Sequence, residues 1–254
     1  MTRRDVYLVC GGRWHDFDFA RLELLKLLAE DDRVRVNVAA DYLDLDAISR
    51  ADALVTYTCD VRPTARAQTV LRDFVADGGR WLALHGTNAV LEQRSDGQFE
   101  APRVLGPVAT VLGSQFLSHP PITPYKVEVI APDHPLVAGI EAFETDDELY
   151  LSKLHAPEEH TVLLATRWSG DTGYGFVDHE WPDDDLRPVL YVRPFGKGEV
   201  VYFTLGHCRG HYDMQPMLPY YPVVERGSWE RPEFVEILRR AIRWAVDTDK
   251  EHTS

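Results

Sequence analysis

The chain has 254 residues, 44% of them hydrophobic, so it can bury a full core, and we expect one domain over residues 1–254 with its core at 5–246. The formal net charge is −14 and no cluster of Lys and Arg stands out, which argues against nucleic acid or an anionic membrane as a partner. Three scattered cysteines argue against a disulfide framework, and no segment is apolar for long enough to form a signal peptide or a membrane span. We therefore expect a cytoplasmic protein.

The first half of the chain alternates predicted strands and helices. Apolar periodicity and end signals predict strands at 5–10, 34–39, 53–58 and 81–85, and helices at 17–29 and 64–76. Strands separated by helices imply right-handed crossovers and a parallel sheet. Gly11, Cys59, Asp60 and His85 would then lie along one edge of that sheet, where open α/β folds bind their ligands.

The second half is richer in strands. Strands are predicted at 124–130, 149–154, 161–168, 189–195 and 199–205, a loop at 170–187, and an amphipathic helix at 232–246. Gly196 and Lys197 separate the last two strands and predict a tight hairpin turn. The expected fold class is α/β, with a mostly parallel sheet flanked by helices and a strand-rich second half.

His85 is the first candidate site residue, because an apolar strand ends at it and Gly86 follows at once. Glycine permits a sharp turn there, so the histidine would face the crevice beyond the strand end. An imidazole at such an elbow can bind a metal or move a proton. The alternative is a strand-end histidine whose ring is hydrogen-bonded to a nearby carbonyl. Asn88, three residues on, is a candidate for substrate binding.

A second group of candidates follows the first strand. Gly12, Trp14, His15 and Asp16 are candidate substrate-binding residues, because paired glycines let a ligand approach the backbone closely. The alternative is that Asp16 only caps the following helix. The segment lacks the Gly-x-Gly-x-x-Gly pattern, so we expect no nucleotide.

Two further segments carry candidate ligands. Glu148 stands just before a predicted strand, where it either faces a cleft or belongs to a solvated acidic turn. His207 follows the strand at 199–205, and Arg209 and His211 come soon after it. On a helix His207 and His211 would share a face, as metal ligands often do, although the neighbouring glycines disfavour a helix.

Together, His85, Glu148 and His207 could form a His/His/carboxylate set, with His211 as a further ligand. Such a set suits Zn²⁺, Mn²⁺ or Fe²⁺. A metal site, a metal-free acid/base site and no site all remain open from these residues alone. Tyr212 and other aromatic residues in predicted loops suit a sugar, because their rings offer an apolar face and a polar tip.

The order of short motifs along residues 5–246 resembles the trehalose-utilisation ThuA-like family, within the class I glutamine-amidotransferase-like superfamily. The motifs are Gly11, Gly12, His15 and Asp16; Gly78 and Gly79 before Leu84, His85 and Gly86; Asp133, His134 and Pro135; Asp147 to Tyr150; and Gly196 to Gly198 before Gly206 and His207. The resemblance implies a flavodoxin-like three-layer sandwich. It also implies that amidotransferase chemistry is absent, because His85 stands where glutaminases have cysteine.

The resemblance further implies a role in sugar metabolism, on trehalose or related disaccharides whose ring hydroxyl has been oxidised to a ketone. Our first hypothesis is an enzyme that cleaves or isomerises such a keto-sugar, with His85 or Glu148 as the base and a metal or Arg209 stabilising the enolate. The alternative is a non-catalytic sugar-binding or regulatory protein. A small-molecule sugar is the expected partner, and strand edges with aromatic loops favour a homo-oligomer.

Overall fold

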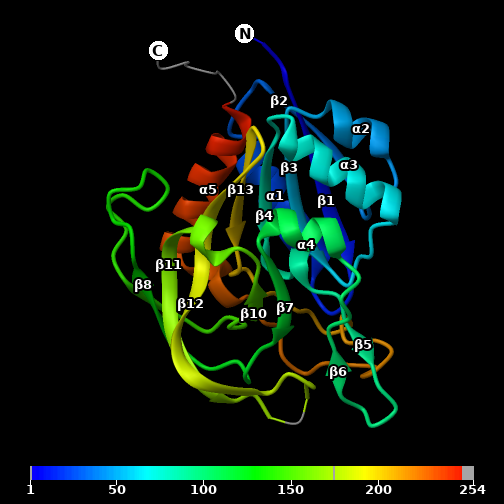
Figure 1. Cartoon of the computed structure of the whole chain (residues 1–254), viewed down its shortest axis with the longest axis vertical. Helices are drawn as coiled ribbons and strands as arrows, with labels where there is room; N and C mark the ends of the chain where they lie inside the picture. Colours follow the sequence, from blue (N-terminus) through cyan, green and yellow to red (C-terminus); the bar gives the residue numbers. More distant parts are fainter. Residues whose placement is uncertain (1, 174, 248–254) are drawn as a thin grey trace.

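The computed structural model describes residues 2–173 and 175–247, and a nine-stranded sheet forms its centre (Figure 1). The strand order is β2-β1-β3-β4-β13-β12-β11-β8-β9. Its strands are β1 (Arg4–Gly12), β2 (Val34–Ala39), β3 (Ala53–Cys59), β4 (Arg80–Leu84), β8 (Tyr125–Val129), β9 (Phe143–Thr145), β11 (Thr161–Asp171), β12 (Glu180–Phe195) and β13 (Gly198–Phe203). The predicted elements of the first half are all present, with ends that agree to within two residues.

The sheet is mixed, whereas we expected it to be mostly parallel. It is parallel from β2 to β13 and antiparallel from β13 to β9. The physical reason is the predicted hairpin, which is confirmed: Phe195 pairs with Gly198, and Gly196 has a φ of 61°. A two-residue turn can join only antiparallel neighbours, and it reverses the chain at this point.

The prediction of a loop at 170–187 is wrong over most of that segment. β11 runs to Asp171 and β12 begins at Glu180, so the Asp- and Pro-rich segment extends a long, curved hairpin (Figure 1). Register shifts along this pair accommodate the irregular residues. Arg187 donates through Nε to the Trp168 carbonyl at 3.1 Å, which adds a side-chain link between the two strands. Local composition was therefore overridden by strand pairing.

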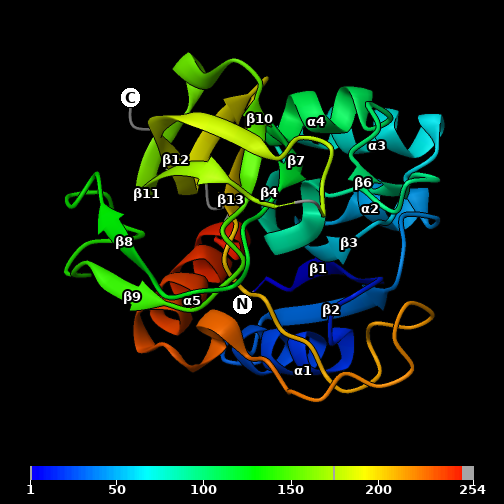
Figure 2. The ribbon, with the colours of Figure 1, turned by 90° about the horizontal axis from the view of Figure 1, so that it is seen from below.

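Helices cover both faces of the sheet, which gives three layers (Figure 2). The helices are α1 (Phe17–Leu28), α2 (Leu45–Arg50), α3 (Ala65–Ala76), α4 (Gly106–Leu112) and α5 (Pro232–Val246). α1 and α5 lie on one face, and α2, α3 and α4 lie on the other. α1 and α3 begin at side-chain caps, Asp16 and Thr64.

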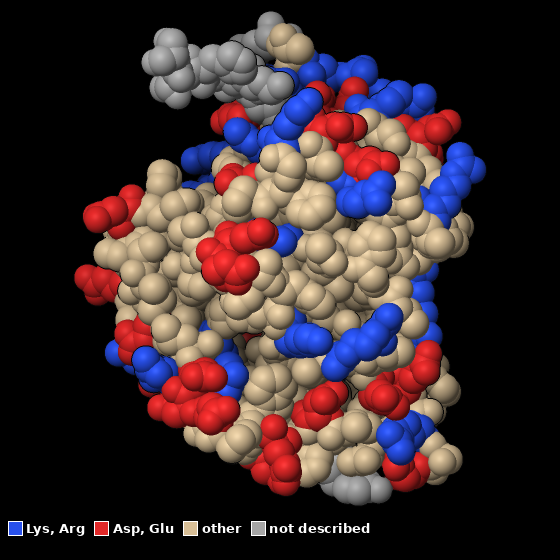
Figure 3. All heavy atoms as spheres, in the orientation of Figure 1, with Lys and Arg blue, Asp and Glu red and all other residues tan. Residues whose placement is uncertain are grey.

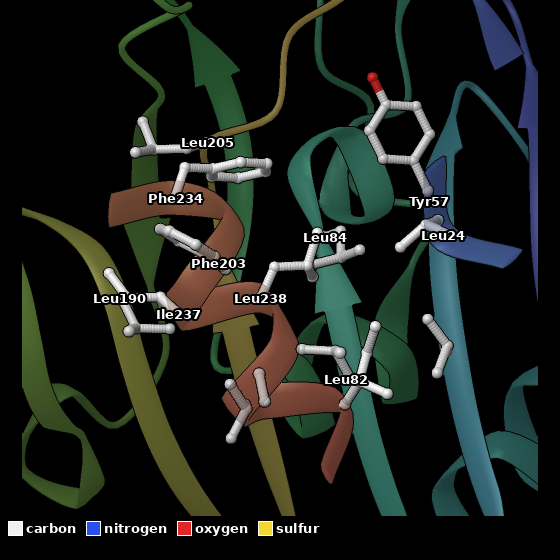
Figure 4. Close-up of a cluster of buried hydrophobic side chains, with 14 of the residues drawn as sticks. Leu24, Tyr57, Leu82, Leu84, Leu190, Phe203, Leu205, Phe234, Ile237 and Leu238 are labelled. Atoms are coloured by element: carbon white, nitrogen blue, oxygen red, sulfur yellow. The ribbon is translucent and has the colours of Figure 1, made fainter. Parts of the chain in front are cut away.

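The larger part of the core lies between α5 and the sheet. Phe234, Ile237 and Leu238 of α5 are buried and point toward the central strands (Figure 4). They meet Leu84 of β4 and Phe203 of β13. This packing fixes the two strands whose ends lead into the candidate site.

Short elements lie near the carboxyl ends of the parallel strands. They are β5 (Glu92–Gln93) paired with β6 (Phe99–Glu100), β7 (Ser114–Ser118) paired with β10 (Leu151–Leu154), and 3₁₀-helices at His85–Asn88 and Gly227–Glu230. A third 3₁₀-helix, Pro157–Glu159, directly precedes β11. Figure 2 views the molecule from this end, where the segment between β13 and α5 runs beside α1.

On the face drawn in Figure 3, acidic and basic side chains are interspersed around a broad uncharged area. Within the described residues, no helix has the length and apolar character needed to cross a membrane. The three cysteines are free thiols and all are buried.

One histidine away from the four strand ends, His160, has a strongly lowered pKa. The ring of His160 stacks on Tyr191, with centroids 4.5 Å apart and planes 7° apart. Burial, aided by the charge of Arg193, lowers the pKa of His160 to about 4. Because this pKa lies below the ordinary 6.5, the unfolded chain takes up a proton at His160 at a higher pH than the folded protein does. The free energy of unfolding therefore falls as the pH drops from 6.5 toward 4, and this loss is absent above pH 6.5.

We therefore predict that His160→Phe reduces the acid sensitivity of the fold. Phenylalanine keeps a planar ring against Tyr191 and cannot take up a proton. Between pH 6.5 and 4 the variant should lose about 1 kcal/mol less unfolding free energy than the wild type, a figure reduced for partial exposure. Urea unfolding at both pH values measures this, and an equal loss in the two proteins would contradict it.

Candidate functional site

Four buried side chains converge beyond the carboxyl ends of the parallel strands. They are His15 after β1, His85 after β4, Glu148 before β10 and His207 after β13. One ligand atom from each lies within 4.8 Å of the others. The structure thus brings together the three residues predicted as a ligand set, and it adds His15, which we expected to bind substrate.

The backbone at His85 explains why the histidine faces inward. β4 ends at Leu84, and His85 has a φ of 44°, an uncommon conformation for a residue with a side chain. Gly86 lies so close to β3 that an added Cβ would be 2.6 Å from the Thr58 carbonyl oxygen. The glycine is therefore required for a close approach of two backbones, and that approach turns His85 toward the crevice.

Backbone carbonyls fix the orientation of two of the imidazoles. Nδ1 of His85 lies 2.8 Å from the Thr204 carbonyl oxygen, and Nδ1 of His15 lies 3.2 Å from that of Arg13. A carbonyl only accepts, so each Nδ1 carries a proton and donates it. The Nε2 atoms of both rings consequently present their lone pairs to the cluster.

These two Nε2 atoms are only 2.8 Å apart. Two facing lone pairs repel, so the contact needs a proton or a cation between or beside the nitrogens. A proton is disfavoured on His15, because burial lowers its pKa to about 4 despite the hydrogen bond to Glu148. The Tyr150 hydroxyl, 3.2 Å from Nε2 of His85, can donate a proton to that nitrogen, whereas a cation bound by both rings would satisfy both lone pairs.

His207 is oriented by a carboxylate instead. Its Nε2 lies 2.8 Å from Oε2 of Glu225, and its Nδ1 lies 3.2 Å from Oε1 of Glu148. The Nδ1 contact falls outside hydrogen-bond geometry, so this buried nitrogen points into the cluster without a hydrogen-bonding partner among the described residues. Burial opposes the charged ring, but Glu148 and Glu225 outweigh it and raise the pKa of His207 to about 9, so a cation that binds Nδ1 must displace the proton from that nitrogen.

Glu148 supplies the negative charge at the centre. Burial alone would raise its pKa, but His207 and His119 hold the pKa of this carboxyl well below its ordinary range. Three imidazoles, each anchored through its outer nitrogen, and one buried carboxylate form a set that suits Zn²⁺, Mn²⁺ or Fe²⁺. The residues present could therefore hold a divalent cation.

His211 lies outside this group, which corrects its prediction as a ligand. Its Nδ1 lies 2.7 Å from the Tyr221 carbonyl oxygen, and its ring stacks on Tyr220 at 4.8 Å. The segment after His207 is not a helix, so a spacing of four residues does not bring the two histidines to one face. His15 contributes the third imidazole instead.

Asp16 and Gly12, which we predicted to bind substrate, have structural roles instead. Asp16 caps α1, with Oδ1 accepting from the Phe19 backbone N–H at 3.0 Å, which is the alternative considered from the sequence. A Cβ on Gly12 would lie 1.9 Å from the Cys59 carbonyl oxygen, so this glycine accommodates β3. Neither residue lines the pocket that is formed by Trp14, His15, Glu148 and their neighbours.

Asn88 and Tyr212, also predicted to bind substrate, do not line that pocket either. The buried Asn88 amide donates through Nδ2 to Ser114 Oγ at 2.7 Å. Tyr212 is 66% exposed. Asn88 therefore has a structural hydrogen bond and Tyr212 faces solvent. Of the predicted substrate-binding residues, Trp14 and His15 line the pocket.

A pocket of about 110 Å³ opens over the cluster. His15 and Glu148 lie at its polar end, together with His119, Tyr150 and Arg209. Arg209 donates through Nη2 to Glu148 at 3.2 Å and through Nη1 to Glu225 at 2.9 Å. The pocket thus presents a positive guanidinium beside the four clustered side chains.

Cys59 also lines the pocket, but its chemistry is unsuited to nucleophilic attack. Burial, reinforced by the charge of Glu148, raises the pKa of the thiol well above its ordinary value. A protonated thiol is a poor nucleophile. This agrees with the expectation that no cysteine replaces the one found in glutaminases.

Sequence reasoning missed His119 and Tyr150. His119 donates from Nδ1 to the Pro120 carbonyl at 2.8 Å, and its Nε2 lies 3.8 Å from Oε1 of Glu148. The Tyr150 hydroxyl lies 3.2 Å from Nε2 of His85. His119 follows β7, a strand that the sequence did not predict, so no strand-end pattern marked it.

Asp147 entered the sequence analysis only as part of a family motif, without a role, yet its buried carboxylate links three segments of the site. Oδ1 accepts from the backbone N–H groups of Glu148 at 2.9 Å and His207 at 3.0 Å. Oδ2 accepts from those of Gly206 and Ser228, both at 2.9 Å. These hydrogen bonds hold two of the four clustered residues at a fixed separation.

The fold and site define an α/β sandwich protein with a buried His₃Glu cluster under a small pocket. The chain belongs to the ThuA family, described as trehalose utilisation, whose model matches residues 6–220. All four clustered residues fall within that match. Membership associates the chain with carbohydrate metabolism in the utilisation of trehalose.

Solved structures support the fold. A ThuA-like protein from Bacteroides uniformis is 15% identical, with a TM-score of 0.65 over 98% of this chain and 94% of its own. One from Parabacteroides merdae is 17% identical, with a TM-score of 0.62 over 97% and 91%. A cytoplasmic protein from Salmonella typhimurium LT2 is 17% identical, with a TM-score of 0.50 over 95% and 97%. No curated protein sequence matches this chain.

We predict that the purified protein carries close to one equivalent of Zn, Mn or Fe, and that His207→Ala loses it. Loss of a ligand should lower affinity by at least about tenfold, since removing even an outer partner of a ligand costs 10–100-fold. His211→Ala is the matched control and should keep the metal. Elemental analysis measures all three proteins. Full occupancy in His207→Ala, or none in wild type after incubation with Zn²⁺ and Mn²⁺, would contradict the assignment.

We also predict that Asp147→Asn destabilises the protein and reduces metal occupancy. In the variant one carboxylate oxygen becomes an N–H₂ group, which faces backbone N–H donors and leaves them without an acceptor. This should lower the free energy of unfolding by about 3 kcal/mol. Asp146→Asn, at a side chain that is 58% exposed, should change it by no more than about 0.5 kcal/mol. Chemical denaturation compares the two, and similar effects would count against the proposed role of Asp147.

Proposed function

We propose that this protein is a cation-assisted enzyme that cleaves an oxidised glycoside, one with a ketone at C3 of the sugar, by elimination. The observation that carries the proposal is the pair of Nε2 atoms of His15 and His85, 2.8 Å apart with both lone pairs facing the cluster. It is supported by Glu148, by the unpartnered Nδ1 of His207 and by a pocket whose lining includes His15 and Glu148. Isomerisation of a keto-sugar would share the first step.

The first step removes a proton from C2, which the neighbouring ketone makes acidic. The C–H electron pair forms a C2=C3 double bond, and the negative charge moves to the oxygen on C3. In the second step the C3=O bond forms again and C1=C2 forms, while the bond from C1 to the glycosidic oxygen breaks. The leaving oxygen takes up a proton, so atoms and charge balance.

His119 is our candidate for the base. Its Nδ1–H is held by the Pro120 carbonyl, so the Nε2 lone pair is available at the pocket. His85 and Glu148, our first candidates from the sequence, are engaged in the cluster. General bases of this kind contribute about 10²–10⁴-fold to the rate.

The other polar groups would stabilise the developing charge. His15, His85, Glu148 and His207 would hold the cation, which when bound supplies electrophilic polarisation of the ketone oxygen. Arg209 directs its guanidinium toward the same end of the pocket and adds a hydrogen-bond donor for that oxygen. Burial of the cluster strengthens both effects, because the local dielectric is low.

The expected setting follows from the family and the fold. The ThuA family's description favours a sugar of trehalose utilisation as the substrate. A structural relative is described as a cytoplasmic protein, and we propose the same location here. A homo-oligomer stays a prediction.

The test is turnover of a 3-keto-glucoside by wild type, His119→Gln and His134→Gln. We expect His119→Gln to lose about 10²–10⁴-fold in kcat with its metal content unchanged. His134 lies outside the pocket, so His134→Gln should be as active as wild type. Saturable sugar binding without turnover by the wild type would instead favour the non-catalytic sugar-binding alternative. Equal activity of His119→Gln would remove His119 as the base.

A further inference from the structure

We propose that Tyr150 is a further catalytic residue, whose hydroxyl donates a hydrogen bond to the ketone oxygen of the substrate once a cation occupies the cluster. The inference rests on the proposed function, because it assigns one more group to the same reaction. Tyr150 both lines the pocket and contacts the cluster. The role concerns the keto-sugar ring alone, so a second sugar ring can be the leaving group.

Packing holds the ring of Tyr150 on two sides. Tyr150 is 4% exposed and directly precedes β10. The centroid of its ring lies 4.5 Å from that of Phe116, which belongs to β7, and 4.7 Å from that of His85. A side chain locked in this way needs little reorganisation when the reaction begins. Tyr150 therefore has a fixed place between the cluster and the pocket.

The Tyr150 hydroxyl makes one hydrogen bond within the described part of the chain, to Nε2 of His85 at 3.2 Å. Nδ1 of His85 donates to the Thr204 carbonyl, so Nε2 accepts and the phenol is the donor. A neutral imidazole has only one acceptor nitrogen, and a cation would bind at that same Nε2. The phenol and the cation therefore compete for it, and Tyr150 loses its partner when His85 holds a cation.

The displaced hydroxyl needs a new acceptor, because a buried donor without a partner costs about 1–3 kcal/mol. A ketone oxygen in the pocket would accept its hydrogen, and this oxygen becomes a stronger acceptor as negative charge develops on it. Burial, reinforced by the charge of Glu148, raises the pKa of Tyr150 well above its ordinary value. The hydroxyl therefore keeps its proton and stabilises the enolate through a hydrogen bond.

Arg209, the other donor that we assign to this oxygen, has much of its donor capacity in use. Its Nη2 donates to Glu148, its Nη1 to Glu225 and its Nε to the Trp14 carbonyl at 3.1 Å. These contacts fix the guanidinium but direct part of it at acceptors of the protein. Tyr150 adds a second, uncharged donor, which the cation releases from its only hydrogen bond among the described residues.

The first test measures binding of Zn²⁺ alone to wild type, Tyr150→Phe and Tyr125→Phe. Tyr150→Phe should bind Zn²⁺ about two- to tenfold more tightly, because the cation no longer has to break a hydrogen bond. Tyr125→Phe is the matched control and should bind Zn²⁺ as wild type does. The Tyr125 hydroxyl is buried without a hydrogen-bonding partner among the described residues, and Tyr125 does not line the pocket. Weaker or unchanged binding by Tyr150→Phe, or no binding by the wild type, would overturn the inference.

The second test detects the hydrogen bond to the ketone itself. A 3-keto-glucoside labelled with ¹³C at C3 is bound to metal-loaded His119→Gln, which lacks the proposed base, and to His119→Gln/Tyr150→Phe. The infrared band of the carbonyl should lie at higher wavenumber in the double variant, because a hydrogen bond weakens the C=O bond. A band at the same position in the two proteins would overturn the inference.

Turnover separates this inference from the proposed function. In an active wild-type background, Tyr150→Phe should lower kcat about 10²–10³-fold and change KM by less than about tenfold, whereas Tyr125→Phe should keep full activity. An unchanged kcat in Tyr150→Phe would remove Tyr150 from the reaction and leave the proposed function standing. Failure of the proposed function is a different result, in which the wild type forms no product from any 3-keto-glycoside, disaccharides included.

Discussion

The buried Asp147 carboxylate accepts hydrogen bonds from backbone N–H groups of three segments. These are its own segment, the segment after β13 and the 3₁₀-helix that precedes α5. Hydrogen bonds to a buried carboxylate are strong, and a donor left unpaired there is costly. They place Glu148 and His207 together, although 59 or 60 residues of chain separate the partners. The candidate site depends on this one side chain.

The chemistry of the site follows from where each imidazole places its proton. Carbonyl oxygens of Thr204 and Arg13 and the carboxylate of Glu225 orient the outer nitrogens of the three histidines. The inner nitrogens are then directed toward Glu148 as a ready-made ligand set. Such outer partners are typical of metal-binding histidines, whereas a histidine that only supports the core needs one partner and no convergence.

Much of the fold could be predicted from the sequence, because hydrophobic periodicity and caps are local signals. The parallel strands, α1, α3 and α5 are examples. The hairpin of β11 and β12 could not be, since its Asp- and Pro-rich residues are held by pairing with a distant partner. At the site, His85 and His207 were marked by strand ends. His119, Asp147 and the role of His15 depend on tertiary proximity, which no local pattern encodes.

The most direct test of the account is the position of a bound metal, found from the anomalous scattering of crystals grown with Mn²⁺ or Zn²⁺. The account predicts one peak, about 2.0–2.2 Å from Nε2 of His15, Nε2 of His85, Nδ1 of His207 and a carboxylate oxygen of Glu148. A cluster without a peak at saturating metal, or a peak bound to other residues, would contradict it.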